Sequence, residues 1–236
     1  MKNTFLVLDT ETCDLSGSVY DIGYTICDKK GNILQTRNAL VREIFTNGKK
    51  MMGAFYAKKL FSHYAPMLES DEIKMESWET IIGWMNQDIA DYSVNVICAY
   101  NAGFDFRVMN ATHKMLGYTG KVLNAPLKTL DLWQFACETK LSQKTYKKLA
   151  NEQGWISPKG NIKTGAEFCY RFCSGEWGFI EDHTALSDAL IETKILADCM
   201  ATKKKIPYGI INKSPWRIVN QNAKGNDPHI HGNKVA

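Results

Sequence analysis

Two carboxylates, Asp9 and Glu11, follow the apolar run 5–8 and are separated by a single residue. Side chains at positions i and i+2 of a strand point to the same face of a sheet. Two carboxylates side by side at the end of a buried strand repel each other unless a cation lies between them. Oxygen ligands favour Mg²⁺ or Mn²⁺ over zinc. The pair therefore predicts a divalent metal site, and a solvated turn is the alternative.

A third carboxylate, Asp105, follows another short apolar run that ends at Ala99. It is expected in the first turn of a helix, beside the carboxyl end of a strand, where ligand sites of open α/β sheets gather. The alternative is that Asp105 only complements the positive end of the helix dipole.

A histidine and a further aspartate, His183 and Asp188, lie five residues apart near the end of the predicted domain. On one helix these side chains would diverge by about 140°. We therefore expect His183 to precede the helix and to turn toward Asp188. Its imidazole titrates near neutral pH and can take a proton from water. A surface histidine at a helix start is the alternative.

Taken together and in this order, the three motifs D-x-E, N-x-x-x-D and H-x-x-x-x-D resemble those of the DEDDh family of 3′–5′ exonucleases. This resemblance implies an α/β, ribonuclease-H-like fold with a central mixed β-sheet flanked by helices, and a site for two Mg²⁺ or Mn²⁺ ions. It implies that Asp9, Glu11 and Asp188 bind the first ion and that Asp9 also bridges to the second. It further implies that Asp105 holds the second ion largely through water and that His183 is the general base.

The resemblance extends over residues 4–200. Segments 19–24, 160–164 and 179–186 are most similar to phage-type exonucleases of the proofreading-subunit kind. Three positions depart from the family pattern, because Cys13, Tyr100 and Asp21 stand where many relatives have Gly, His and Glu. None of them is a metal ligand, so we still expect an active enzyme. Asp131 is interpreted as ending a strand or starting a helix, not as a fifth carboxylate ligand.

The same resemblance implies hydrolysis at the 3′ end of single-stranded DNA, with release of nucleoside 5′-monophosphates. It suggests Thr10 and Thr12 as contacts to the terminal sugar, and we add Asn101 and Phe104 as further substrate-binding candidates. Aromatic rings that stack on bases hold single strands without reading sequence. Tyr56 in the lysine-rich segment 49–59 is another stacking candidate, although most aromatics at helical spacing belong to a core.

Two alternatives stay open. The same chemistry could act on RNA, since no residue decides between DNA and RNA. The second alternative is a non-catalytic subunit that binds nucleic acid or docks on a polymerase. Such a module has no need of four converging carboxylates. The predicted partner is single-stranded nucleic acid, with DNA favoured over RNA, and a polymerase or another replication factor is a further predicted partner.

The elements that must position these residues follow from hydrophobic periodicity. A hairpin sheet followed by alternating strands and helices predicts an α/β fold with a mixed sheet. The expected strands are 4–9, 19–27, 33–41, 94–99 and 127–130. The expected helices are 50–64, 77–89, 104–116, 133–137, 146–152, 165–172 and 186–200.

The composition fits one exonuclease domain over 1–205 and a basic C-terminal tail over 206–236. The 236 residues are 44% hydrophobic and 23% charged, as in an average globular protein. From residue 203 onward seven Lys and Arg face one Asp, which predicts either a polyanionic partner or a solvated tail. Seven scattered cysteines without a C-x-x-C pair indicate reduced thiols.

No run of about 20 apolar residues could span a membrane, and run 5–8 is too short for a signal-peptide core. We therefore expect no membrane partner. The predicted location is the cytoplasm of a bacterium or of a phage-infected host.

Overall fold

Six strands form one mixed sheet in the order β4-β3-β2-β1-β5-β6. The structure is a computed structural model that describes residues 3–202 and 204–220. The strands that come first in the chain pair antiparallel, and β4, β5 and β6 pair parallel with their neighbours. The predicted α/β fold with a central mixed sheet is therefore confirmed. The strands are β1 (Thr4–Asp14), β2 (Gly17–Asp28), β3 (Ile33–Val41), β4 (Lys74–Glu76), β5 (Val96–Ala99) and β6 (Lys128–Asp131).

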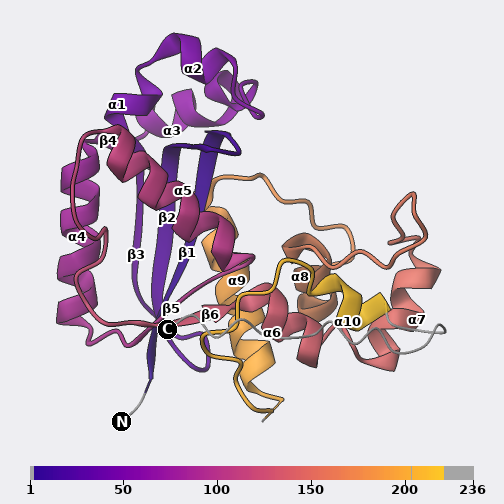
Figure 1. Cartoon of the computed structure of the whole chain (residues 1–236). Helices are drawn as coiled ribbons and strands as arrows, with labels where there is room; N and C mark the ends of the chain where they lie inside the picture. The colour runs from indigo at the N-terminus through magenta and orange to yellow at the C-terminus, as the bar shows by residue number, and fades with distance from the viewer. Residues whose placement is uncertain (1–2, 203, 221–236) are drawn as a thin grey trace.

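Helices cover both faces of the sheet (Figure 1). They are α1 (Arg42–Phe45), α2 (Gly48–Met52), the π-helix η1 (Leu60–Tyr64), α3 (Ala65–Glu69), α4 (Trp78–Asp91), α5 (Ala102–Met115), α6 (Leu132–Thr139), α7 (Lys144–Glu152), α8 (Ala166–Ser174), α9 (Ala185–Met200) and α10 (Trp216–Asn220).

Alternation along β1 divides the core into two layers. Leu6 and Leu8 pack in the layer that contains residues of α4 and α5. Phe5 and Val7 pack in the layer with residues of α6, α7 and α9. Both sets are fully buried, which is why the strand reads as a continuous apolar run. Asp9 and Glu11 continue the α9 side, because they share the parity of Phe5 and Val7.

Several predicted bounds differ from the structure. β1 runs through the carboxylates to Asp14, so Asp9 and Glu11 lie within a strand and not after it. The predicted helix over 50–64 is wrong, because the chain forms α2, then turns, and forms η1 only from Leu60. Strand β4 and helix α10 were not predicted. The turn at Gly53 interrupts what the apolar spacing alone presents as one helix.

The described part of the predicted tail lies against the body of the molecule. Val219 of α10 is fully buried, and the Asn220 side chain both accepts from and donates to the backbone of Ile162. Lys203, Lys224 and Lys234, which carry part of the predicted basic excess, lie outside the described residues. The domain boundary at 205 stays a prediction.

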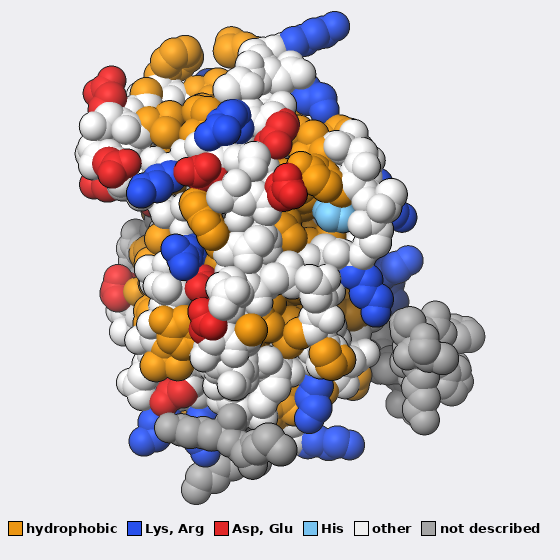
Figure 2. Space-filling view, turned by 90° about the vertical axis from the view of Figure 1, so that its left-hand side faces the viewer, with side chains coloured by type: hydrophobic (Ala, Val, Ile, Leu, Met, Phe, Trp, Pro, Cys, Tyr) orange, Lys and Arg blue, Asp and Glu red, His pale blue; other side chains and the backbone are white. Residues whose placement is uncertain are grey.

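Charges are mixed on the face shown in Figure 2, where acidic and basic side chains are interspersed among apolar ones. Within the described ranges, every helix is too short or too polar to cross a membrane.

Candidate active site

Strand β1 presents Asp9 and Glu11 to a cavity of about 620 Å³. In the ladder with β2, Asp9 lies opposite Gly23 and Glu11 lies opposite Asp21, and a bulge follows Glu11. His183 and Asp188 line the same cavity. The D-x-E and H-x-x-x-x-D motifs, which are far apart in the sequence, thus meet at one place beside the sheet.

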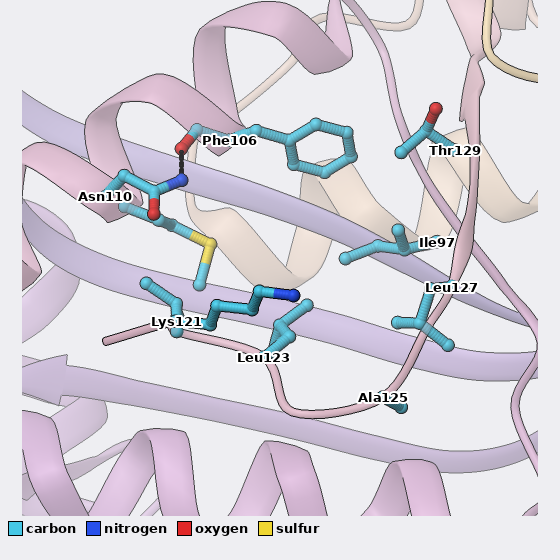
Figure 3. Close-up of a pocket in the computed structure, with 10 residues that line it drawn as sticks. Ile97, Phe106, Asn110, Lys121, Leu123, Ala125, Leu127 and Thr129 are labelled. Atoms are coloured by element: carbon cyan, nitrogen blue, oxygen red, sulfur yellow. Dashed lines mark hydrogen bonds between the residues drawn. The ribbon is translucent and has the colours of Figure 1, made fainter. Parts of the chain in front are cut away.

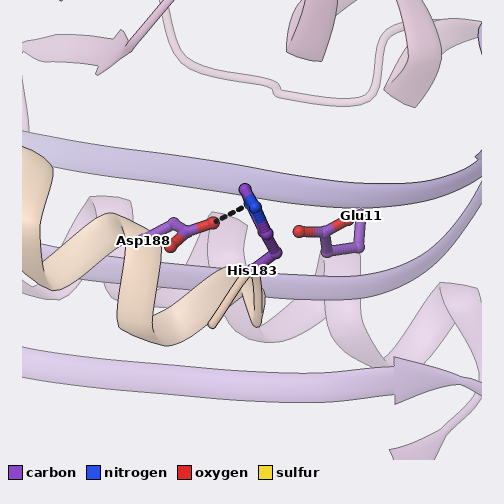
Figure 4. A group of neighbouring side chains, drawn as sticks. All are labelled: Glu11, His183 and Asp188. Carbon is purple, nitrogen blue, oxygen red and sulfur yellow. Dashed lines mark ion pairs between the residues drawn. The ribbon is translucent and has the colours of Figure 1, made fainter. Parts of the chain in front are cut away.

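Helix α9 supplies Asp188, and His183 precedes it. His183 has a positive φ of 55°, and Thr184 is the N-cap residue. The Nδ1 atom of His183 is 3.9 Å from Oδ2 of Asp188, and Figure 4 shows the imidazole between Asp188 and Glu11. The prediction that His183 lies before the helix and turns toward Asp188 is confirmed.

Gly23 allows this approach of α9 to the sheet. A Cβ atom at Gly23 would lie 2.1 Å from the backbone nitrogen of Leu186. No side chain fits in that space, so the first turn of α9 can lie directly on β2 only because residue 23 is glycine. Asp21, two residues earlier, accepts a hydrogen bond from the backbone N–H of Ala185 at 3.0 Å.

Asp105 lies in the first turn of α5, as predicted, and is buried. Its Oδ1 accepts a hydrogen bond of 2.8 Å from the hydroxyl of Thr10. Asp105 does not itself line the cavity, but its charge is among the causes that raise the pKa of Asp9. The structure therefore places it behind the cavity wall, where Thr10 orients it.

The four substrate-binding candidates all line the cavity. The hydroxyl of Thr10 is engaged by Asp105, so a side-chain contact from Thr10 to a sugar would have to compete with that bond. Asn101 precedes α5 with a φ of 67°. Phe104 packs under the guanidinium of Arg107, 5.2 Å from its ring centroid. Their contact with a nucleotide remains a prediction, as does that of Thr12.

Burial and mutual repulsion disfavour the charged carboxylates. The pKa of Glu11 is raised to about 8 and that of Asp188 to about 9, chiefly by burial. Burial also raises the pKa of Asp105 to about 7. The pKa of Asp9 is well above its ordinary value, through burial and then through the charge of Asp105. A divalent cation would offset these costs.

The donor set fits such a cation. One ligand atom from each of Glu11, His183 and Asp188 lies within 4.8 Å of the others. Among the described residues, Oδ1 of Asp188 and Oε1 of Glu181 are buried without a hydrogen-bond partner. Buried carboxylate oxygens normally have partners, and a metal ion would supply the missing one.

The cavity is also lined by two carboxylates that the motifs did not identify. Glu192 lies one helical turn after Asp188, and its Oε2 accepts a hydrogen bond from the backbone of Tyr100 at 3.0 Å. The i, i+4 spacing from Asp188 was a usable signal for this residue. Oε2 of Glu181 lies 3.7 Å from Nδ1 of His183, and only its proximity in sequence could have indicated it.

Tyr56, whose stacking on a base remains a prediction, has a ring neighbour within the protein. It lines the cavity, and its ring stacks on the imidazole of His183, with centroids 4.7 Å apart. Lys59, which no motif singled out, donates a hydrogen bond from Nζ to the backbone oxygen of His183.

Asp131 behaves as predicted. It ends β6, and its Oδ1 accepts hydrogen bonds from the backbone N–H groups of Trp133 and Gln134 at the start of α6. This carboxylate is thus used as a helix cap.

A smaller cavity of about 260 Å³ lies beside α5 and residues 121–129 (Figure 3). Its wall is mostly apolar, with Leu123 beside the amine of Lys121, and no Asp, Glu or His is among its described lining residues. It offers none of the chemistry of the larger cavity.

No family model matches the sequence, and no curated protein matches it. Among solved structures, the chain is similar to cell-death related nuclease 4 (CRN-4), with a TM-score of 0.55 and 14% identity over 89% of this chain and 68% of that one. A second similar structure is Exonuclease X in complex with 5′-overhanging duplex DNA, with a TM-score of 0.46 and 20% identity over 84% of this chain and 92% of that one. The likeness to CRN-4 shows that the two proteins share a fold.

Proposed function

We propose that the chain is a metal-dependent 3′–5′ exonuclease that hydrolyses the terminal phosphodiester bond of single-stranded DNA and releases nucleoside 5′-monophosphates. One observation carries this proposal. Asp9, Glu11, His183 and Asp188 come from distant parts of the sequence and line one cavity, with Asp105 directly behind it. The chain shares its fold with a protein whose name describes a nuclease, which is compatible with the proposal.

Asp9, Glu11 and Asp188 would hold the first of two Mg²⁺ or Mn²⁺ ions. Asp9 would also hold the second, and Asp105, behind the cavity wall, would contribute to it largely through water. When bound, the ions stabilise charge on the attacking and leaving oxygens of an in-line displacement. His183 takes the proton from the attacking water. Burial, and then the charge of Lys59, lower the pKa of His183, which favours the neutral imidazole that can accept a proton.

The rim of the cavity suits an unpaired strand. Phe104 lines the cavity, and the exposed side chains of Leu15 and Phe55 lie at the same cavity. Such rings and apolar side chains contact base faces without reading sequence, and each stacked base contributes about 1–3 kcal/mol. Thr12 and Asn101 add polar groups for the terminal nucleotide.

A polymerase or another replication factor as partner, and a relationship to phage-type proofreading subunits, remain predictions from the sequence motifs. The RNA alternative uses the same residues. It is distinguished by substrate, since the 2′-hydroxyl is the difference that the site must accept or reject.

Digestion of 5′-labelled single-stranded DNA and of matched RNA tests the proposal. We expect a ladder that shortens from the 3′ end of DNA with Mg²⁺ or Mn²⁺, and none with EDTA or with Asp9→Ala. A ladder on RNA alone would assign the protein to RNA processing with the same residues. Cleavage that persists in Asp9→Ala and in Asp188→Ala would refute the proposed site.

A further inference from the structure

The backbone of His183 is held in an uncommon conformation. Its φ of 55° lies in the left-handed region, which residues other than glycine rarely adopt. Such a conformation persists only where the surrounding structure holds it. The contacts that hold His183 therefore decide where its imidazole points in the cavity.

Tyr56 and Lys59, here called the 56–59 clamp, provide these contacts from a distant part of the chain. Nζ of Lys59 donates a hydrogen bond of 2.5 Å to the backbone oxygen of His183. The ring of Tyr56 is stacked on the imidazole at an interplanar angle of 20°. The Lys59 ammonium also lies 4.0 Å from the centroid of the Tyr56 ring, so the three residues contact one another pairwise.

Lys59 is placed for this role by its burial. Lys59 is only 9% exposed, and lysines are seldom buried without partners. Burial lowers the pKa of Lys59, while the charges of Glu11 and Asp188 oppose that change. The ammonium thus lies close to the carboxylates of the site while it hydrogen-bonds to the histidine backbone. The neighbouring Lys58 is exposed.

The segment that carries the clamp is anchored next to the start of α9. Residues 60–64 form the π-helix η1, an element that often marks functional sites. The hydroxyl of Tyr64 donates to Oδ2 of Asp21, the same oxygen that accepts from the backbone N–H of Ala185. The clamp and the first turn of α9 are therefore tied to one carboxylate.

We propose that Lys59 is a positioning residue that holds His183 in its working orientation, through the histidine carbonyl and through the Tyr56 ring. This inference rests on the proposed function, in which His183 takes the proton from water. Lys59 does not touch substrate in this role. It acts only through His183.

A double-mutant cycle tests this dependence. We expect Lys59→Met to lower kcat on single-stranded DNA about 10- to 100-fold, less than the roughly 10²–10⁴-fold contribution of a general base itself, and to leave KM unchanged. In the His183→Ala background, Lys59→Met should add no more than about twofold, because its target is gone. Lys59→Arg should recover part of the loss, and Lys58→Met should match the wild type. Additive losses in the cycle would overturn the proposal.

Histidine-labelled NMR provides a reading that needs no activity. The His183 signal is identified as the one lost in His183→Ala. The chemical shift of the His183 signal should change in Lys59→Met and in Tyr56→Leu. Tyr56 is exposed, so its substitution should not disturb the fold. The His113 signal should stay in place, because His113 packs against Trp78 and Tyr118.

The kinetic and NMR measurements distinguish failure of the proposed function from failure of the proposed role of Lys59. A wild-type protein without nuclease activity would refute the proposed function, yet the NMR shifts would still report on the clamp. An unchanged His183 signal in both clamp variants would refute the clamp, even in an active enzyme.

Discussion

Asp188 has an unfavourable environment in the metal-free protein, and this has a measurable consequence. Its carboxylate is buried near Glu11 and Glu181, which together with burial raise its pKa to about 9, and its Oδ1 has no partner among the described residues. The charged form of Asp188 is therefore costly to the stability of the metal-free protein, as is expected of a residue kept for the proposed function.

The substitution Asp188→Asn separates these two effects. We expect it to raise the free energy of unfolding of the metal-free protein at pH 7 by about 1 kcal/mol or more, because the amide is neutral without the proton that the Asp188 carboxylate must take up on folding at this pH. Nuclease activity should fall at least about 100-fold if Asp188 is the metal ligand proposed above, because the ion that stabilises charge in the transition state would be held less well. Thermal melts in EDTA and cleavage assays measure the two. A variant that is both less stable and fully active would contradict this account.

The same raised pKa values set a pH dependence. In the folded, metal-free protein Glu11 and Asp188 retain protons up to about pH 8 and 9, whereas in the unfolded chain they lose them near pH 4. The folded state binds more protons between these limits, so stability falls as pH rises from about 5 to 9. Melting temperatures in EDTA should decrease across that range. Saturating Mn²⁺ should reduce or remove the decrease, because the ion takes the place of the protons.

Residues within a motif were predictable, and residues that approach from elsewhere were not. Asp9, Glu11, His183 and Asp188 stand at fixed local spacings, and the structure brings all four to one cavity. Their catalytic and metal-binding roles remain predictions. Lys59 reaches His183 across 124 positions of sequence, and no local spacing encodes such an approach.

Helix α9 lies directly on strand β2 at Gly23, where no side chain fits. We expect Gly23→Ala to cost about 3 kcal/mol or more, because the new Cβ would overlap the backbone of Leu186. Gly83→Ala is the matched control. Gly83 is exposed in α4 with open space around it, so alanine there should stabilise by about 0.5–1 kcal/mol. Urea unfolding of both variants measures the difference.

The strand elements were easier to predict than the 42–73 region. β3 has the predicted bounds, and the apolar runs before Asp9 and after residue 93 correspond to buried strands. Between α2 and η1 the apolar spacing of a helix is present, but the chain turns at Gly53. Tertiary contacts of Tyr64 with Asp21 and of Lys59 with His183 favour that turn over a continuous helix. Local periodicity does not contain them.

At the scale of the whole molecule, the end of the described chain tests the predicted domain boundary. A chain ended at residue 205 would lose the buried side chain of Val219 and the two hydrogen bonds between Asn220 and Ile162. We expect it to be less stable than a chain ended at residue 220 by about 2–4 kcal/mol. Equal urea midpoints for the two chains would instead support an independent tail.

The cavity draws most of its walls from four segments, residues 9–15, 55–56, 100–104 and 181–192. This has a consequence for the newly made protein. A ribosome completes three of these four segments well before it adds α9. Until α9 has left the exit tunnel and lies on β2, the nascent chain holds Asp9 and Glu11 without their histidine. Under the proposed function, this order of synthesis would keep the unfinished chain from attacking nucleic acid around it.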